Sequence, residues 1–231
     1  MLDLSNVDAF YGNSRALQDV SMSVGDGEFV SILGRNGVGK TTCMRAVMGL
    51  MDRTTGSIKL DGTELIDKGT HERARAGIGY VPQGRGILPR FTVRENLRMG
   101  TFATEDGNGA IDAWIFELFP ILKDFLDRPG GNLSGGQQQQ LAIGRALLTQ
   151  PKVILLDEPT EGIQPNIVEQ IEEVLVQLNQ EHGMTVVLVE QNVAFARRAS
   201  QRFVILDRGS VAAQGAVDEL SDELVHRHMA V

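Results

Sequence analysis

The feature that most constrains this 231-residue chain is a glycine-rich turn at Gly34-Arg35-Asn36-Gly37-Val38-Gly39-Lys40-Thr41. The turn fits the pattern G-x-x-x-x-G-K-S/T, in which glycines let the backbone wrap around phosphate oxygens in front of a helix N-terminus. The apolar residues 28–33 predict a buried strand before the turn, and residues 41–48 predict a helix after it. Because strand, loop and helix come in the required order, a nucleotide site is favoured over a glycine turn with a chance lysine.

Two side chains of this loop carry the predicted chemistry. Lys40 is expected to neutralise the β- and γ-phosphates, and the hydroxyl of Thr41 is expected to bind Mg²⁺. The loop alone indicates a nucleotide and leaves open what the nucleotide is used for.

The composition narrows the classes of protein that can carry such a loop. The net charge of −8 argues against nucleic acid as a partner, since nucleic-acid binding normally needs a basic face. We expect no signal peptide, because residues 1–6 have neither a basic start nor an apolar stretch. No apolar run in the sequence approaches the roughly 18 residues that span a bilayer. We therefore expect a soluble, cytoplasmic protein whose membrane role would pass through a partner. The one cysteine, Cys43, excludes an internal disulfide and is expected to be a small core residue.

The order of the predicted elements indicates an α/β fold. Strands are expected at 2–10, 17–24, 28–33, 57–60, 77–81, 153–156, 185–189 and 202–207. Helices are expected at 41–48, 93–101, 111–119, 134–149, 166–180 and 193–200, with a polar loop at 104–109. Alternating strands and helices predict a parallel sheet with helices on both faces, and the helical middle would be an insertion or a sub-domain.

A second motif follows the predicted strand at 153–156, where Asp157 and Glu158 stand at its carboxyl end. In open α/β sheets, ligands bind at the carboxyl ends of the strands. Asp157 is suited to hold Mg²⁺ through water, and Glu158 is then placed to orient or deprotonate an attacking water. An acidic helix cap is the alternative, but such a cap is rarely paired with a phosphate loop upstream.

A third motif is Leu133-Ser134-Gly135-Gly136-Gln137, which precedes an apolar helix. Ser134 is expected to be the N-cap, and the open N–H groups behind it would form an anion site. A flexible turn is the alternative for this pentapeptide on its own.

Together the three motifs make the chain resemble the nucleotide-binding subunit of an ABC (ATP-binding cassette) transporter over nearly its whole length. The resemblance implies a P-loop NTPase fold, with a RecA-like core, an N-terminal antiparallel β sub-domain and a helical sub-domain at about residues 85–150. All three belong to one ABC ATPase domain over residues 1–231. The resemblance also implies ATP and Mg²⁺ as cofactors.

The resemblance assigns roles to individual residues. The residues implied for ATP binding are Tyr11, Gly34, Asn36, Gly37, Gly39, Lys40, Thr41, Thr42, Ser134, Gly135, Gly136 and Gln137. Mg²⁺ would be held by Thr41, Gln83 and Asp157, and catalysis would depend on Glu158, Gln83 and Gln191. In the family, Tyr11 would stack on adenine, although a plain surface tyrosine is the alternative. Residues 133–137 of one subunit would contact the γ-phosphate on the other, so this chain builds half of each site.

Two positions depart from the family pattern. Gln164 stands where the loop after Glu-Pro-Thr usually has aspartate, and Gln191 stands where the switch histidine is usual. Glutamine can donate a hydrogen bond to the γ-phosphate but cannot carry a proton's charge as protonated histidine can. These departures put the rate of hydrolysis in question rather than ATP binding.

The departures also point to a subfamily. Val189-Glu190-Gln191-Asn192 and residues 82–97 resemble the branched-chain amino acid uptake group, in which two different ATPases pair on two permeases. Within that group, residues 158–165 and Gln83 look most like the second ATPase subunit of the urea importer. We therefore expect a urea importer, with a branched-chain amino acid importer as the alternative.

The resemblance implies several partners. They are a second ABC ATPase subunit (a second copy or a different chain) packed head-to-tail, integral membrane permeases and, indirectly, a periplasmic or extracellular solute-binding protein. The location would be peripheral, on the cytoplasmic face of the inner membrane. Arg85, Arg90 and Phe91, within residues 84–97, are candidates to line a permease groove, although a solvated basic loop is the alternative.

Two other classes of nucleotide protein fit less well. Soluble ABC ATPases of DNA repair or translation carry coiled coils or two cassettes, whereas this chain has one cassette and no heptad run. A switch GTPase would need Asn-Lys-x-Asp, which is absent.

Overall fold

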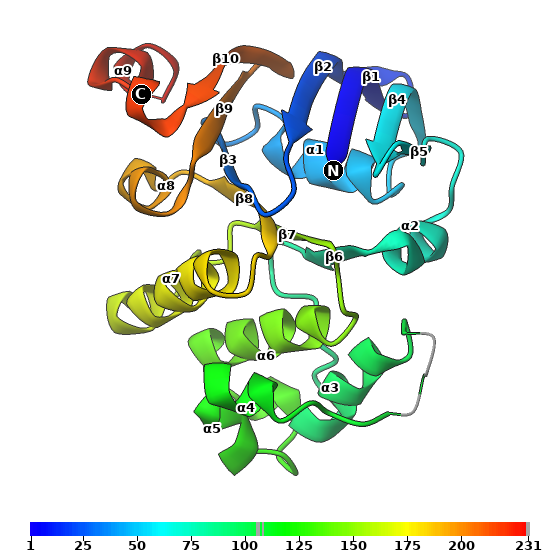
Figure 1. Ribbon diagram of the computed structural model, residues 1–231, viewed down its shortest axis with the longest axis vertical. Coiled ribbons are helices and arrows are strands. Elements are labelled where there is room, and N and C mark those ends of the chain that lie inside the picture. The colour runs from blue at the N-terminus through cyan, green and yellow to red at the C-terminus, as the bar shows by residue number, and fades with distance from the viewer. Residues whose placement is uncertain (105–106, 108, 230–231) are drawn as a thin grey trace.

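The computed structural model describes residues 1–104, 107 and 109–229. The smaller of its two sheets is antiparallel, with the order β2-β1-β4-β5, and carries the N-terminus at the upper right of Figure 1. Its strands are β1 (Leu2–Tyr11), β2 (Ser14–Val24), β4 (Arg53–Leu60) and β5 (Thr63–Glu64).

The larger sheet has the order β10-β9-β3-β8-β7-β6 and is parallel except for β10, which pairs antiparallel with β9. Its strands are β3 (Phe29–Leu33), β6 (Ile78–Val81), β7 (Val153–Asp157), β8 (Thr185–Glu190), β9 (Arg202–Asp207) and β10 (Ser210–Ala216). The parallel strands place their carboxyl ends along one edge, where ligands bind in such sheets.

The α-helices of the described residues are α1 (Lys40–Val47), α2 (Thr70–Ala76), α3 (Val93–Thr101), α4 (Trp114–Leu118), α5 (Pro120–Asp124), α6 (Gly135–Leu147), α7 (Pro165–Gln180), α8 (Val193–Ala199) and α9 (Asp222–Met229). Helices α3 to α6 follow one another between β6 and β7 and form the lower part of the molecule in Figure 1. The sub-domain boundaries at residues 85 and 150 stay a prediction.

Both faces of the larger sheet are buried, which explains why its strands read as continuous apolar runs. Successive side chains of a strand point to opposite faces. Along β7, Val153 and Leu155 face a core shared with α1 and the antiparallel sheet. Ile154 and Leu156 face a second core, which α3, α6 and α7 complete. The expected parallel sheet with helices on both faces is therefore confirmed.

Most predicted elements are confirmed to within a few residues, and the exceptions have local causes. The helix expected at 111–119 is wrong in extent, because the structure has the shorter α4 and then α5, which begins at Pro120. Proline lacks the N–H that a continuing helix needs but suits the first position of a new helix. The sequence reading missed α2, the two-residue strand β5, β10 and α9. Part of the expected loop at 104–109 (Glu105, Asp106 and Asn108) lies outside the described residues.

No helix among the residues that the structure describes combines the length and the apolarity that a membrane crossing needs.

Cys43 lies on α1 and is buried in the core between the two sheets, as expected. Burial raises the pKa of its thiol to about 12, so the reactive thiolate is scarce at neutral pH. We predict that native protein reacts with a thiol reagent such as DTNB at least about 100-fold more slowly than protein unfolded in guanidinium chloride. Rapid stoichiometric labelling of the folded chain would contradict the burial of this residue.

Candidate functional site

The glycine-rich loop leaves β3 and ends at the start of α1. Its glycines adopt positive φ values, 151° at Gly34, 78° at Gly37 and 112° at Gly39. A Cβ on Gly34 would lie 2.5 Å from the carbonyl oxygen of Leu206, so no side chain fits there. The loop thus depends on glycine for both its backbone conformation and its close approach to β9.

The buried side chain of Lys40 folds back across this loop. Its Nζ donates to the carbonyl oxygens of Gly34 at 2.8 Å and Arg35 at 2.9 Å. The same ammonium lies 3.3 Å from Oε1 of Glu158. One buried cation therefore joins the phosphate loop to the end of β7, and its charge is available to an anion that enters the loop.

Asp157 closes the carboxyl end of β7 beside the first turn of α1. Thr41 Oγ1 donates to its Oδ1 at 3.1 Å, and the hydroxyl of Tyr80 lies 3.5 Å from its Oδ2. Burial raises the pKa of Asp157 to about 6, and the nearby charge of Glu158 adds to this shift. Hydroxyl and carboxylate oxygens are the ligands that Mg²⁺ prefers, so Thr41 and Asp157 fit the expected metal.

Gln83 is placed differently from the other two expected Mg²⁺ ligands. Its side-chain Nε2 donates to Oε2 of Glu158 at 3.2 Å and to Oε2 of Glu161 at 2.9 Å. The backbone N–H of Gln83, rather than its side chain, is directed at Asp157. In this conformation the side chain of Gln83 therefore bonds the carboxylates after β7 and does not point at Thr41 and Asp157, the two residues that fit Mg²⁺.

Three side chains contact the carboxylate of Glu158. Besides Lys40 and Gln83, Gln191 donates from Nε2 to its Oε1 at 2.9 Å. The residue is nearly buried, and its backbone has a left-handed φ of 47°, which is uncommon for a residue with a side chain. The bond from Glu158 N to Val189 O at 2.9 Å helps to hold this turn.

Gln191, at the end of β8, also donates to Oδ1 of Asn36 at 2.6 Å. Its backbone is set by the buried carboxylate of Glu190, which accepts from Gln191 N at 3.0 Å and from Thr160 Oγ1 at 2.6 Å. Burial raises the pKa of Glu190. Sequence reasoning overlooked Glu190, although a charged residue directly after the apolar residues 186–189 was a usable signal.

These groups surround a cavity of about 320 Å³. Its lining residues are Asn36, Gly37, Gly39, Lys40, Thr41, Thr42, Gln83 and Glu158. Tyr11 stands at the edge, with its hydroxyl 3.5 Å from Thr42 Oγ1, and the residue is 42% exposed. The guanidinium of Arg45 lies 5.6 Å from the centre of that ring. The structure thus brings together most of the residues that the sequence assigned to nucleotide and metal.

Ser134, Gly135, Gly136 and Gln137 do not line this cavity, because they begin α6 in the lower part of the molecule (Figure 1). The prediction that Ser134 caps the helix is confirmed, since Gln137 N donates to its Oγ at 3.4 Å. The side chain of Gln137 returns the bond, accepting from Ser134 N at 2.9 Å. Gln164 is the N-cap residue of α7 and makes no side-chain cap bond.

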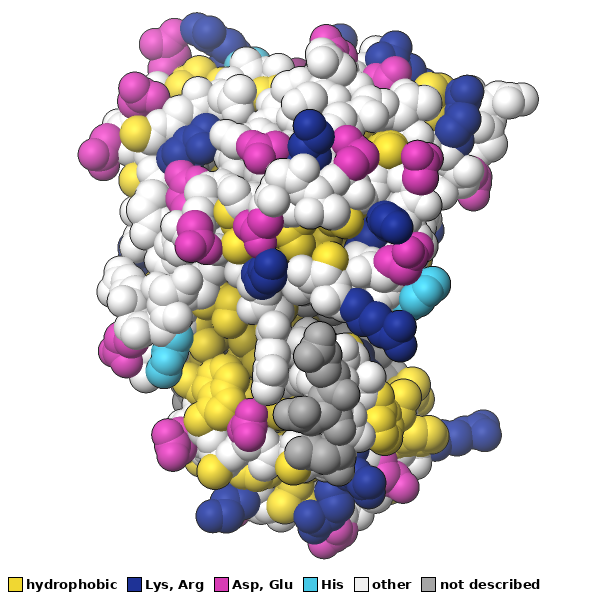
Figure 2. Space-filling model, turned by 45° about the vertical axis from the view of Figure 1, so that its right-hand side comes forward, with side chains coloured by type: hydrophobic (Ala, Val, Ile, Leu, Met, Phe, Trp, Pro, Cys, Tyr) yellow, Lys and Arg dark blue, Asp and Glu magenta, His cyan; other side chains and the backbone are white. Residues whose placement is uncertain are grey.

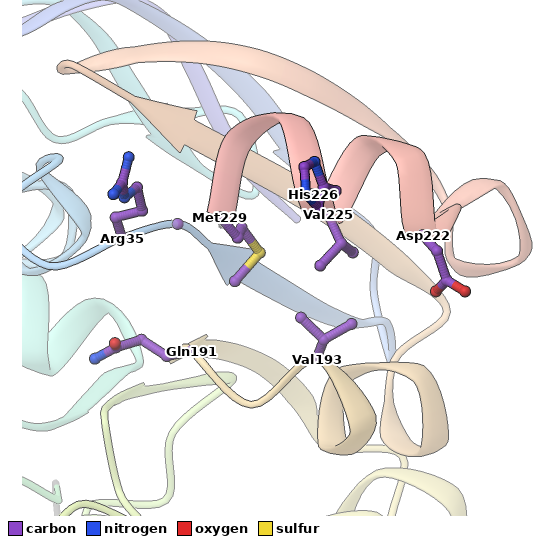
Figure 3. A pocket seen from close by; sticks show the side chains of 8 residues that line it. Arg35, Gln191, Val193, Asp222, Val225, His226 and Met229 are labelled. Atoms are coloured by element: carbon purple, nitrogen blue, oxygen red, sulfur yellow. The ribbon is translucent and has the colours of Figure 1, made fainter. Parts of the chain in front are cut away.

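A second pocket of about 470 Å³ lies on the far side of Gln191 (Figure 3). Val225 and Met229 of α9 point into it opposite Val193 and Gln191, whereas Arg35 points away. Arg197 of α8 holds the start of α9 by donating a hydrogen bond to Asp222 at 2.6 Å. A helix that the sequence reading missed therefore forms the wall of this pocket opposite the loop that carries Gln191.

Known proteins resemble this chain in both sequence and fold. The sequence model of the ABC transporter family matches residues 17–161. The chain is 42% identical over 212 residues to the high-affinity branched-chain amino acid transport ATP-binding protein BraG of Pseudomonas aeruginosa, covering 91% of each. It is 34% identical to the probable branched-chain amino acid transport ATP-binding protein LivF of Archaeoglobus fulgidus, covering 95% of this chain and 94% of LivF. A dimeric ATP-binding cassette solved in a post-hydrolysis state with ADP and Pi superposes with a TM-score of 0.82 at 32% identity, over 94% of this chain and 99% of that one.

We predict that Lys40→Ala lowers the affinity for Mg-ATP by at least about 100-fold, because charge-assisted bonds to phosphate are lost. Isothermal titration calorimetry measures the change. Lys59→Ala, which removes an exposed lysine of β4, is the matched control and should bind like the wild type. Unchanged affinity in the Lys40 variant would refute the assignment of this loop to phosphate.

Gln191→Ala removes the donor shared by Asn36 and Glu158 and leaves the rest of the cavity intact. We expect kcat for ATP hydrolysis to fall about ten-fold, which matches roughly 1–3 kcal/mol for a hydrogen bond to a charged group. Gln191→His keeps a donor and should match or exceed the wild type. Gln180→Ala, at the exposed end of α7, is the control. Wild-type turnover in Gln191→Ala would place the switch function elsewhere.

Proposed function

We propose that this chain hydrolyses ATP to power the import of branched-chain amino acids. The proposal starts from the finding that the chain belongs to the ABC transporter family. As a member it is an ATPase, the ATP-binding subunit of an importer. The observation that carries the choice of solute is the identity of 42% with BraG over 91% of both chains.

Urea was the solute expected from Gln83 and from residues 158–165. The named relatives BraG and LivF are branched-chain amino acid transport proteins, so they support the alternative better than urea. Because the ATPase does not touch the solute, a few residues around its own site are a weaker guide than similarity over the whole chain. The proposal therefore takes the branched-chain amino acid as the solute.

The cavity supports a definite pose for ATP. The N–H groups of the loop and Lys40 would hold the phosphates, and the half-exposed ring of Tyr11 would stack on adenine. Thr41 and Asp157 would hold Mg²⁺, which when bound neutralises charge on the β- and γ-phosphates.

Glu158 is the residue that we assign to the chemical step. A water aligned with the γ-phosphate would give its proton to this carboxylate while its oxygen forms the new bond to phosphorus and ADP leaves. Lys40 and Gln191 now bond the same Oε1, and both can turn to the phosphate oxygens when ATP enters. Their departure frees Oε1 to accept the proton.

The position of Ser134 to Gln137, away from the cavity, supports a role in a second site. In this proposal they reach the γ-phosphate held by a second cassette packed head-to-tail, and the related cassette with ADP and Pi is itself dimeric. The other partners proposed are integral membrane permeases and, through them, a solute-binding protein. The chain would then lie on the cytoplasmic face of the inner membrane.

Exposed apolar side chains support a permease contact on the lower part of the molecule. Phe91, Met99 and Phe102 are 43%, 44% and 54% exposed, and Figure 2 shows hydrophobic side chains gathered on this part. Arg90 is exposed beside Phe91. Arg85, in contrast, is turned to α6, where it bonds Gln138 rather than lining a surface groove.

The experiment is solute uptake by proteoliposomes that contain the chain with its permeases and solute-binding protein. We expect ATP-driven accumulation of radiolabelled leucine or valine and none of urea. Glu158→Gln should bind ATP and lower both hydrolysis and uptake by at least about 100-fold, since the amide keeps the shape but not the base. Glu169→Gln, at an exposed carboxylate of α7, is the control. Uptake of urea alone would overturn the solute, and normal turnover in Glu158→Gln would overturn the mechanism.

A further inference from the structure

Arg85 joins the loop that carries Gln83 to the start of α6. Its backbone has a left-handed φ of 72°, and its Nη1 donates to Oε1 of Gln138 at 3.3 Å. The guanidinium lies against Gly135, where an added Cβ would be 3.0 Å from Nη2. Gln138 in turn donates from Nε2 to the carbonyl oxygen of Leu133 at 3.1 Å. Two side chains therefore connect this loop to the residues on either side of Ser134.

A second arginine, near the other end of α6, also holds this loop. Arg145, in the last turns of α6, donates from Nη2 to the carbonyl oxygen of Gly86 at 2.7 Å. Two arginines thus hold residues 83–86 against α6, at two points along the helix. A shift of α6 along or across its axis must then move this loop as well.

The other end of the connection is the catalytic carboxylate. Gln83, two residues before Arg85, donates to both Glu158 and Glu161. A continuous path of hydrogen bonds and three backbone residues thus runs from Glu158 through Gln83, Arg85 and Gln138 to the carbonyl group next to Ser134.

In the head-to-tail pair of the proposed function, on which this step rests, the two ends of the path serve different ATP molecules. Glu158 acts on the ATP of this chain, whereas Ser134 faces the ATP held by the other cassette. We infer that Arg85 is a positioning residue that couples the two ATP sites of the assembly, by holding residues 134–137 in a placement set by Gln83 and Glu158.

The link can be removed without disturbing an ion pair. Within the described ranges no ion pair includes Arg85, and its side chain hydrogen-bonds to Gln138. The cavity around Lys40 does not include Arg85. Loss of its guanidinium should therefore spare binding of ATP to one cassette and weaken the step that needs both.

The test compares two readouts of Arg85→Ala. Binding of Mg-ATP to the single chain, measured by calorimetry, should stay within two-fold of wild type, because it uses the cavity of that chain alone. The ATP kcat/KM of the assembled transporter should fall about ten-fold, the size expected for one lost charged hydrogen bond. Arg85→Lys, which can still donate to Gln138, should recover most of the loss.

A double-mutant cycle separates a shared path from two unrelated defects. Gln138→Leu should cost the same as Arg85→Ala, and the double variant should be no worse than either. Arg75→Ala, an exposed arginine of α2, is the control and should behave like wild type. Additive losses, an equal loss of binding to the single chain, or a kcat/KM within two-fold of wild type would each overturn the inference. Failure of the wild-type assembly to hydrolyse ATP would instead overturn the proposed function.

Discussion

The carboxylate of Glu158 is the point on which the rest of the site depends. Three side chains from three separate segments meet it: Lys40 after β3, Gln83 after β6 and Gln191 after β8. A nearly buried carboxylate needs such partners, because an unpaired charge out of water is costly. Lys40 and Gln191 are also the groups that an incoming phosphate can recruit, whereas Gln83 stays on the carboxylate. Nucleotide binding and release of the base are therefore one exchange of hydrogen bonds.

The sheet makes this meeting possible. β3, β8, β7 and β6 are consecutive neighbours and run parallel, so the loops at their carboxyl ends share one edge. Hydrophobic cores on both faces of the sheet hold the strands that carry these loops. The loop before α1 is held by the close approach of Gly34 to Leu206, which only glycine permits. The side chains that carry the chemistry therefore lie at the edge of a tightly packed scaffold.

Local patterns predicted the parts of this site that depend on residue type and spacing. The glycines and Lys40 of the phosphate loop, the carboxylates after β7 and the Ser134 cap could all be found in the sequence, because each follows from a local requirement. The pairing of Gln191 with Glu158 could not be found from local patterns, since it depends on which strands are neighbours in the sheet. The contact of Arg85 with α6, and the position of α9 across a pocket from Gln191, depend on tertiary packing in the same way. A surface role for Arg85 was the natural reading of its basic loop, and only the fold shows the bond to Gln138.

The distances around Lys40 in a structure of the Glu158→Gln protein with Mg-ATP test the account most directly. The account predicts that Lys40 Nζ leaves the carbonyl oxygens of Gly34 and Arg35 for the β- and γ-phosphates. It also predicts that the amide of Gln191 moves from residue 158 to the γ-phosphate. A structure in which Lys40 keeps both carbonyl bonds and the nucleotide lies outside this cavity would contradict it.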